Sequence, residues 1–166
     1  MEENIFSKLV NALKEEHLTL SSIESFTGGL FSKLVTDISG SSQVFFGSLV
    51  TYKTSIKEDV LHIKKEIIDK YGVVSKQTSI EMVKKGKEMF NTDIVVSFTG
   101  NAGPTVCEDN KQVGECYISI LYLDNIYSFS YLFKDLSRDG VRNNSVNSAA
   151  KEILKIISKN SIKNNN

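Results

Sequence analysis

The stretch LTLSSIESFTGGLFSKLVTDI, residues 18–38, decides the fold of this chain. Its first part is rich in apolar residues and has the length of a strand, and Gly28 and Gly29 follow it. After the two glycines, apolar residues recur at every third or fourth position, which is the period of a helix with one buried face. The stretch therefore predicts a strand over residues 18–23, a glycine turn, and a helix over residues 30–38.

The composition of the chain is that of one folded domain. It has 166 residues, enough to bury a hydrophobic core without disulfides or metals. Hydrophobic residues make up 40% and charged residues 24% of the chain, with one proline, which is typical of a globular protein and not of a disordered one. We predict a single domain over residues 1–160 and a frayed tail over residues 161–166.

The charge and the cysteine content exclude several classes of protein. Lys+Arg and Asp+Glu number 20 each, so the formal net charge is zero and the chain lacks the basic field of a general nucleic-acid binder. Its cysteines, Cys107 and Cys116, are too few and too far apart for a disulfide framework or a zinc ribbon, which is typical of a reducing cytosol. The first 17 residues do not resemble a secretory signal. We therefore expect a cytoplasmic protein without nucleic-acid or membrane partners.

The rest of the sequence mixes helical and strand patterns. Glycine and proline cluster over residues 99–104, which predicts a loop there. Asp139 is placed to cap the last helix, and Asp124 and Asn125 are placed to turn a hairpin. This mixture predicts a layered α/β sandwich with a mixed sheet and helices packed on it. The remaining predicted helices cover residues 3–16, 55–62, 64–71 and 75–90, and the remaining strands cover residues 44–52, 93–98, 113–123 and 126–133.

The most informative local feature is ESFTGG, residues 24–29. It places the hydroxyl of Ser25 at the end of a strand, followed by Thr27, Gly28 and Gly29 at the start of a helix. A helix N-terminus offers unpaired N–H groups and partial positive charge, which suit a bound phosphate or the oxyanion that forms when a serine attacks a carbonyl. A structural turn explains the same residues in most proteins, so this stretch alone leaves both interpretations open.

Tyr52 and Lys57 form a second candidate, near the end of the next predicted strand. A serine hydroxyl is a poor nucleophile until a base removes its proton, and a lysine kept neutral by burial can be that base. A tyrosine can relay the proton or fix the geometry. The alternative interpretation is a tyrosine at a strand end and a solvated lysine.

Further candidates follow the buried strand at residues 93–98 and precede the last helix. Thr99, Gly100 and Asn101 should open on the same sheet edge as the ESFTGG turn, where ligands of open α/β sheets gather. Arg138 and Arg142 lie one helical turn apart and can clamp a phosphate, although a plain turn and two exposed helix charges explain these five residues as well. No metal-ligand motif such as HxxxH or CxxC occurs, and we expect no metal.

These motifs, in this order, resemble the C-terminal domain of the CinA family of competence and damage-inducible proteins, whose stand-alone members include nicotinamide-nucleotide amidases. The resemblance covers most of the chain, and its motifs are ESFTGG (24–29), TDISGSS (36–42), VTY with its lysine (50–57), YGVVS (71–75), SFTGNAGP (97–104), KQVGE (111–115) and the arginine pair.

The resemblance implies an α/β sandwich and an enzyme site that needs neither metal nor cofactor. Carried over by position, Ser25 is the nucleophile, Tyr52 and Lys57 activate it, and Thr99 and Arg138 contact the substrate. The implied reaction hydrolyses the carboxamide of nicotinamide mononucleotide, a pyridine nucleotide, to nicotinic acid mononucleotide and ammonia. The resemblance also implies a homodimer.

The sequence departs from the family pattern beside the site. Residues 105–110, TVCEDN, replace the glycine-rich stretch that usually follows the Gly-Pro pair, and Phe26 stands where a cysteine is usual. Longer members also carry an N-terminal molybdopterin-binding-like domain, for which we expect no room in this sequence. The altered loop motivates an alternative hypothesis, a catalytically silent module that binds a nucleotide or a protein partner. Ammonia release from nicotinamide mononucleotide distinguishes the two.

Overall fold

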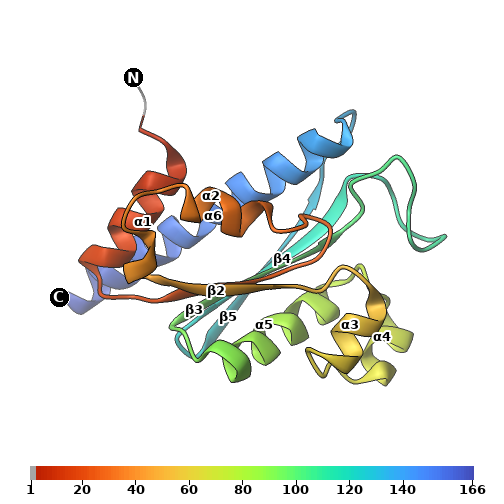
Figure 1. Ribbon diagram of the computed structural model, residues 1–166, viewed down its shortest axis with the longest axis horizontal. Coiled ribbons are helices and arrows are strands. Elements are labelled where there is room, and N and C mark those ends of the chain that lie inside the picture. Colours follow the sequence, from red (N-terminus) through yellow and green to blue (C-terminus); the bar gives the residue numbers. More distant parts are fainter. Residues whose placement is uncertain (1–2) are drawn as a thin grey trace.

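The computed structural model describes residues 3–166 and consists of one mixed sheet between two layers of helices (Figure 1). The strand order is β2-β1-β3-β4-β5. The first three strands in this order are parallel, and the remaining pairings are antiparallel. The predicted layered α/β sandwich with a mixed sheet is therefore confirmed. The strands are β1 (Leu20–Glu24), β2 (Phe45–Val50), β3 (Ile94–Gly100), β4 (Glu115–Tyr122) and β5 (Asn125–Leu132).

Helices cover both faces of the sheet (Figure 1). Among the described residues, no helix is both long enough and apolar enough to cross a membrane. The helices of one face are α1 (Ile5–Glu15), α2 (Leu30–Thr36) and α6 (Arg138–Asn164), those of the other face are α3 (Thr54–Asp59), α4 (Lys65–Tyr71) and α5 (Lys76–Phe90), and a short 3-10 turn, η1, spans Ser41–Gln43.

The core is divided by the sheet into two clusters, and β3 contributes to both. Phe98 points into the larger cluster, where its ring lies 5.3 Å from that of Phe31 on α2. Val95 points to the other face and packs with Met82 of α5. Because both faces of β3 are buried, its sequence is a continuous apolar run and not an alternating one. This is the pattern from which the strand was predicted.

Two boundaries differ from the predictions in a way that matters for the site. Strand β3 continues through Thr99 and Gly100, which pair with Tyr117 and Cys116 of β4, so the loop begins only at residue 101. Glycine is required there because a Cβ at Gly100 would overlap Cys116. The cap of α6 is Ser137, whose Oγ accepts from the backbone N–H of Gly140 at 3.0 Å. Asp139 lies in the first turn of α6 and is not the cap.

The last helix and the hairpin also differ in their ends. Helix α6 continues to Asn164, so four of the six residues predicted as a frayed tail are helical. The hairpin between β4 and β5 turns at Leu123 and Asp124, one residue earlier than predicted, with Leu123 at φ 54°. Its backbone N–H donates to the carbonyl of Asp93 at 2.8 Å, which fixes the turn against the start of β3.

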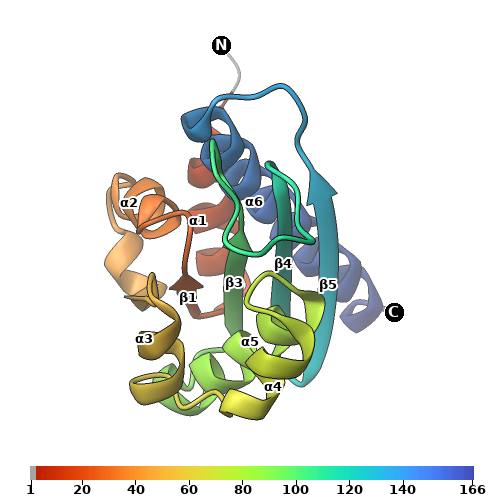
Figure 2. The same cartoon turned by 90° about the vertical axis from the view of Figure 1, so that its right-hand side faces the viewer.

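The parallel arrangement of β1, β2 and β3 brings three loops to one edge of the sheet, because parallel strands end on the same side. Ser25 follows β1, Thr51 and Tyr52 follow β2, and Asn101 follows β3. Figure 2 shows the connection between β3 and β4 running in front of this edge. The prediction that the segments after β1 and β3 open on the same sheet edge is thus confirmed.

Candidate active site

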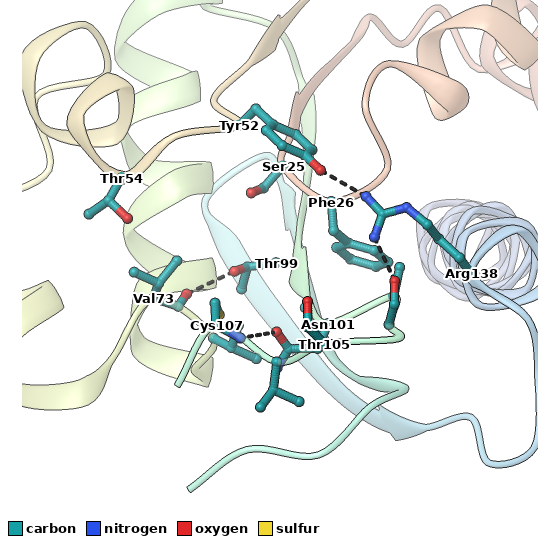
Figure 3. Close-up of a pocket in the computed structure, with 15 residues that line it drawn as sticks. Ser25, Phe26, Tyr52, Thr54, Val73, Thr99, Asn101, Thr105, Cys107 and Arg138 are labelled. Atoms are coloured by element: carbon teal, nitrogen blue, oxygen red, sulfur yellow. Dashed lines mark hydrogen bonds between the residues drawn. The ribbon is translucent and has the colours of Figure 1, made fainter. Parts of the chain in front are cut away.

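A pocket of about 280 Å³ opens at this edge of the sheet (Figure 3). Its wall contains six of the eleven residues predicted for the site. Lys57 lies behind Ser25 and does not line the pocket, and the turn residues 27–29 and Arg142 are not part of its wall either. The six are Ser25, Tyr52, Thr99, Gly100, Asn101 and Arg138.

Ser25 and Lys57 form a close pair. The Lys57 Nζ atom lies 2.9 Å from the Ser25 Oγ atom and 2.5 Å from the carbonyl oxygen of Thr51. The Ser25 backbone N–H donates to the Phe98 carbonyl at 3.1 Å, which ties the turn to β3. The Lys57 side chain is fully buried, although the residue lies on a six-residue helix near the surface. The structure therefore brings the predicted nucleophile and base within hydrogen-bonding distance.

Burial changes the proton affinity of this lysine. Desolvation lowers the pKa of Lys57 from 10.5 to about 8, and the negative charge of Cys107, when it is ionised, opposes that shift. At pH 7 about a tenth of the molecules then hold a neutral amine at this position. A neutral amine keeps a hydrogen for the Thr51 carbonyl and presents its lone pair to the Ser25 hydroxyl. The arrangement can therefore deprotonate Ser25.

Tyr52 lines the pocket but makes a different contact from the one predicted. Its side chain is 57% exposed, and its hydroxyl accepts from the Arg138 Nη2 atom at 2.8 Å. Arg138 also donates from Nη1 to the carbonyl of Gly103 at 2.7 Å. The guanidinium therefore bridges the loop after β2 and the loop after β3 (Figure 3). Within the described residues, the Tyr52 hydroxyl has no hydrogen bond to Ser25 or Lys57.

The glycine turn after Ser25 is held from outside the pocket. Gly28 has φ 61°, and its N–H donates to the Ser25 carbonyl at 3.0 Å, so this N–H is used inside the turn. Arg142 donates from Nη2 to the Thr27 carbonyl at 2.6 Å. A Cβ at Gly28 would lie 2.8 Å from the same Arg142 nitrogen. In this structure Arg142 supports the turn and does not reach the pocket.

Glu24, which was not predicted as a site residue, supports the turn that carries Ser25. It is fully buried, and its Oε1 atom accepts from the Thr27 hydroxyl and the Phe31 N–H, both at 2.9 Å. Its Oε2 atom accepts from the Ser32 N–H at 3.0 Å and the Ser48 hydroxyl at 3.2 Å. The carboxylate therefore joins β1 to the start of α2 on both sides of Ser25. The sequence feature that could have identified Glu24 is an acidic residue at the end of a buried strand, shortly before a helix begins.

Thr99 and Asn101 place polar groups on the opposite wall. The Thr99 hydroxyl donates to the Val73 carbonyl at 2.8 Å. The Asn101 Oδ1 atom accepts from the backbone N–H of Cys107 at 3.1 Å, and its Nδ2 atom has no partner among the described residues. Cys107 also lines the pocket and was not predicted as a site residue. Across residues 3–166, no three His, Cys, Asp or Glu side chains gather in a way that could hold a metal ion.

The sequence profile of the CinA C-terminal domain matches residues 2–157 of this chain. A putative competence-damage inducible protein of Bacillus subtilis is 36% identical over 156 residues, which are 93% of this chain and 36% of that protein. A CinA-like protein of Flavobacterium psychrophilum is 38% identical over 159 residues, which are 96% of this chain and 38% of that protein. The chain thus spans little more than a third of the length of these relatives.

Solved structures share the fold. A CinA superfamily protein from Klebsiella pneumoniae superposes with a TM-score of 0.91 at 21% identity, covering 95% of this chain and 99% of that one. The competence/damage inducible protein CihA from Agrobacterium tumefaciens gives a TM-score of 0.85 at 28% identity, covering 95% and 98%. Fold, motifs and sequence identity agree, and the chain belongs to the CinA C-terminal domain family.

Proposed function

We propose that this chain is a serine amidohydrolase that removes ammonia from the carboxamide of nicotinamide mononucleotide. The observation that carries the proposal is the fully buried Lys57 amine, 2.9 Å from the Ser25 hydroxyl at the edge of a pocket. A buried amine with a lowered pKa beside a hydroxyl is the arrangement that activates a serine nucleophile.

In the first half of the reaction, neutral Lys57 takes the proton of Ser25 while the serine oxygen bonds to the carboxamide carbon. The carbonyl oxygen becomes an oxyanion. The backbone N–H of Phe26 is a suitable donor to it, because Phe26 directly follows Ser25 and lines the pocket. The proton on Lys57 then passes to the departing nitrogen, ammonia leaves, and an ester to Ser25 remains.

In the second half, water attacks this ester. Lys57 takes a proton from the water and returns it to the Ser25 oxygen as the ester bond breaks. The products are the free enzyme and the pyridine carboxylic acid, whose proton is then taken up by the released ammonia to give the carboxylate and an ammonium ion. Atoms and charge balance with water as the second substrate.

Arg138 is the group best suited to the phosphate of the nucleotide. A guanidinium carries five N–H donors, and in Arg138 two nitrogens already donate to Tyr52 and Gly103. The remaining donors can reach phosphate oxygens without breaking the bridge. Binding of the distant phosphate would hold the carboxamide against Ser25. By resemblance to the family we also propose a cytoplasmic role in pyridine nucleotide salvage and a homodimeric assembly.

Ammonia release from nicotinamide mononucleotide by the parent protein and by Ser25→Ala tests the proposal. We expect steady release by the parent, none by Ser25→Ala, and binding of the nucleotide by both, because only the bond-forming atom is removed. Ser55→Ala, at an exposed position of α3, is the matched control and should behave as the parent. Turnover by Ser25→Ala at the parent rate would refute the nucleophile. Binding without turnover by the parent would favour the silent module.

A further inference from the structure

Residues 105–110, which we call the strap, cross from the β3 end of the pocket to the turn between α4 and α5. Glu108 attaches the strap to that turn. Its Oε1 atom accepts from the backbone N–H groups of Val73, at 2.6 Å, and Val74, at 3.1 Å. Neither N–H has another hydrogen-bond partner among the described residues. One side chain therefore satisfies two otherwise unpaired backbone donors.

The turn that receives Glu108 has hydrogen bonds of its own. The hydroxyls of Ser75 and Thr78 both donate to the carbonyl of Gly72, at 2.9 and 2.6 Å. Gly72 has φ 88°, and a Cβ there would overlap the Glu108 carboxylate. The missing side chain at Gly72 therefore leaves the space that the carboxylate occupies. The hydrogen bonds of Ser75 and Thr78 to Gly72 hold this attachment point without involving Glu108.

The other end of the strap forms part of the pocket wall. Thr105, Val106 and Cys107 line it, and the Cys107 N–H donates to the Asn101 Oδ1 atom (Figure 3). Asn101 is 5% exposed, and its Nδ2 atom is enclosed without a partner. An enclosed, unpaired amide donor disfavours the closed arrangement, whereas the carboxylate contacts of Glu108 favour it. These two contributions to the free energy of the closed arrangement have opposite signs. The segment can therefore open while the rest of the domain stays folded.

We propose that the strap is a cover over the substrate pocket and that Glu108 is the positioning residue that keeps it closed. Release of the carboxylate from the backbone of Val73 and Val74 opens the pocket wall, and rebinding encloses the nucleotide. The stretch that departs from the family pattern thus provides retention of the substrate. Only the kinetic part of the test below depends on the proposed amidase function.

Residue-resolved amide hydrogen exchange in Glu108→Ala and Glu108→Gln tests the cover directly. Asp109→Asn is the matched control, because it removes a charge from the neighbouring exposed strap position, for which no hydrogen bond is described. In Glu108→Ala we expect exchange at Val73 and Val74 to rise about tenfold or more, the equivalent of one lost charge-assisted hydrogen bond. The decisive reporter is the Cys107 N–H, which donates to Asn101 Oδ1 and not to the Glu108 carboxylate. Exchange at the Cys107 N–H should become faster together with that at Val73 and Val74, while the amides of β3 stay protected from exchange.

Faster exchange at Val73 and Val74 with an unchanged Cys107 would overturn the proposal, since Glu108 would then cap only its own turn. Loss of protection in β3 would overturn it as well, because the variant would be globally destabilised. Glu108→Gln keeps the shape and one acceptor, so its effects should be smaller than those of Glu108→Ala.

Steady-state kinetics with nicotinamide mononucleotide form the second measurement. We expect Glu108→Ala to raise KM about tenfold with kcat within about twofold of the parent, because the chemical groups are intact and only retention is lost. An equal fall in kcat with unchanged KM would contradict a retaining role. If the parent releases no ammonia, the proposed function fails, and the exchange measurement still decides on the cover.

Discussion

The Lys57 amine lies 2.9 Å from the Ser25 hydroxyl and is completely shielded from solvent. The two residues are 32 positions apart and meet because β1 and β2 are parallel neighbours that end on the same edge. Burial of an amine is unfavourable unless its charge is compensated or lost. Within the described residues, the Lys57 Nζ atom forms hydrogen bonds only to the Ser25 hydroxyl and the Thr51 carbonyl, and its pKa is lowered accordingly.

The pH dependence of turnover should report this lysine. If neutral Lys57 is the base, kcat/KM rises about tenfold per pH unit below about 8 and levels off above it, because only the deprotonated amine accepts the Ser25 proton. The measurement is kcat/KM from pH 6 to pH 9.5 in buffers of constant ionic strength. A profile that is flat across this range would exclude Lys57 as the titrating base.

Lys57→Met should abolish turnover and stabilise the fold at neutral pH. The folded-state pKa of about 8 lies below the unfolded value of 10.5, so between these values the unfolded chain binds more protons and the free energy of unfolding rises with pH. Below pH 8 the charged lysine therefore costs the folded state up to about 3 kcal/mol, which methionine avoids. Urea unfolding of the parent and of Lys57→Met at pH 7 and pH 10.5 measures this difference in the free energy of unfolding.

We expect Lys57→Met to have a higher free energy of unfolding than the parent at pH 7, and the same free energy of unfolding at pH 10.5. Lys53→Met, at an exposed position four residues earlier, is the control and should show no such pH-dependent difference. A Lys57→Met protein less stable than the parent at both pH values would show that the buried charge is well compensated.

Tyr52→Phe distinguishes two roles for the tyrosine. In the structure its hydroxyl accepts from Arg138, so the substitution removes one partly solvated hydrogen bond, worth about 1 kcal/mol. We expect KM to rise about fivefold with kcat nearly unchanged. A proton relay through Tyr52 predicts instead that kcat falls about a hundredfold or more. Steady-state kinetics with nicotinamide mononucleotide separate these outcomes.

Much of the fold could be predicted from local patterns. The continuous apolar run before Thr99 and the helical period after Gly29 identified β3 and α2, because strands buried on both faces and helices with one buried face have distinct patterns. The shared sheet edge of Ser25 and the segment after β3 was also predicted, and it arises because β1 and β3 are parallel.

What could not be predicted were side-chain directions and the partners of individual polar groups. Nothing in the order of residues shows that Arg142 turns to the Thr27 carbonyl, or that Tyr52 turns to Arg138 instead of Ser25. Such choices depend on the three-dimensional packing of helix α6 against the turn after β1. Strand β3 extended through Gly100 because β4 pairs with it there, a tertiary contact that overrides the local preference of glycine for a loop.

Glu24 provides the last prediction, because it acts on Ser25 without touching the pocket. Each Glu24 carboxylate oxygen accepts from a backbone N–H, that of Phe31 or that of Ser32, so the amide nitrogen of Glu24→Gln would face a backbone donor in either orientation. We expect a loss of about 3 kcal/mol in the free energy of unfolding and a fall in kcat larger than the change in KM, since the turn that aims Ser25 loses its support. Asp59→Asn, an exposed acid at the end of α3, is the control for charge alone. Urea unfolding and ammonia release, measured on the same preparations, give the free energy of unfolding and kcat. A Glu24→Gln protein with the stability and the kcat of the parent would show that the carboxylate charge is not needed to hold the turn.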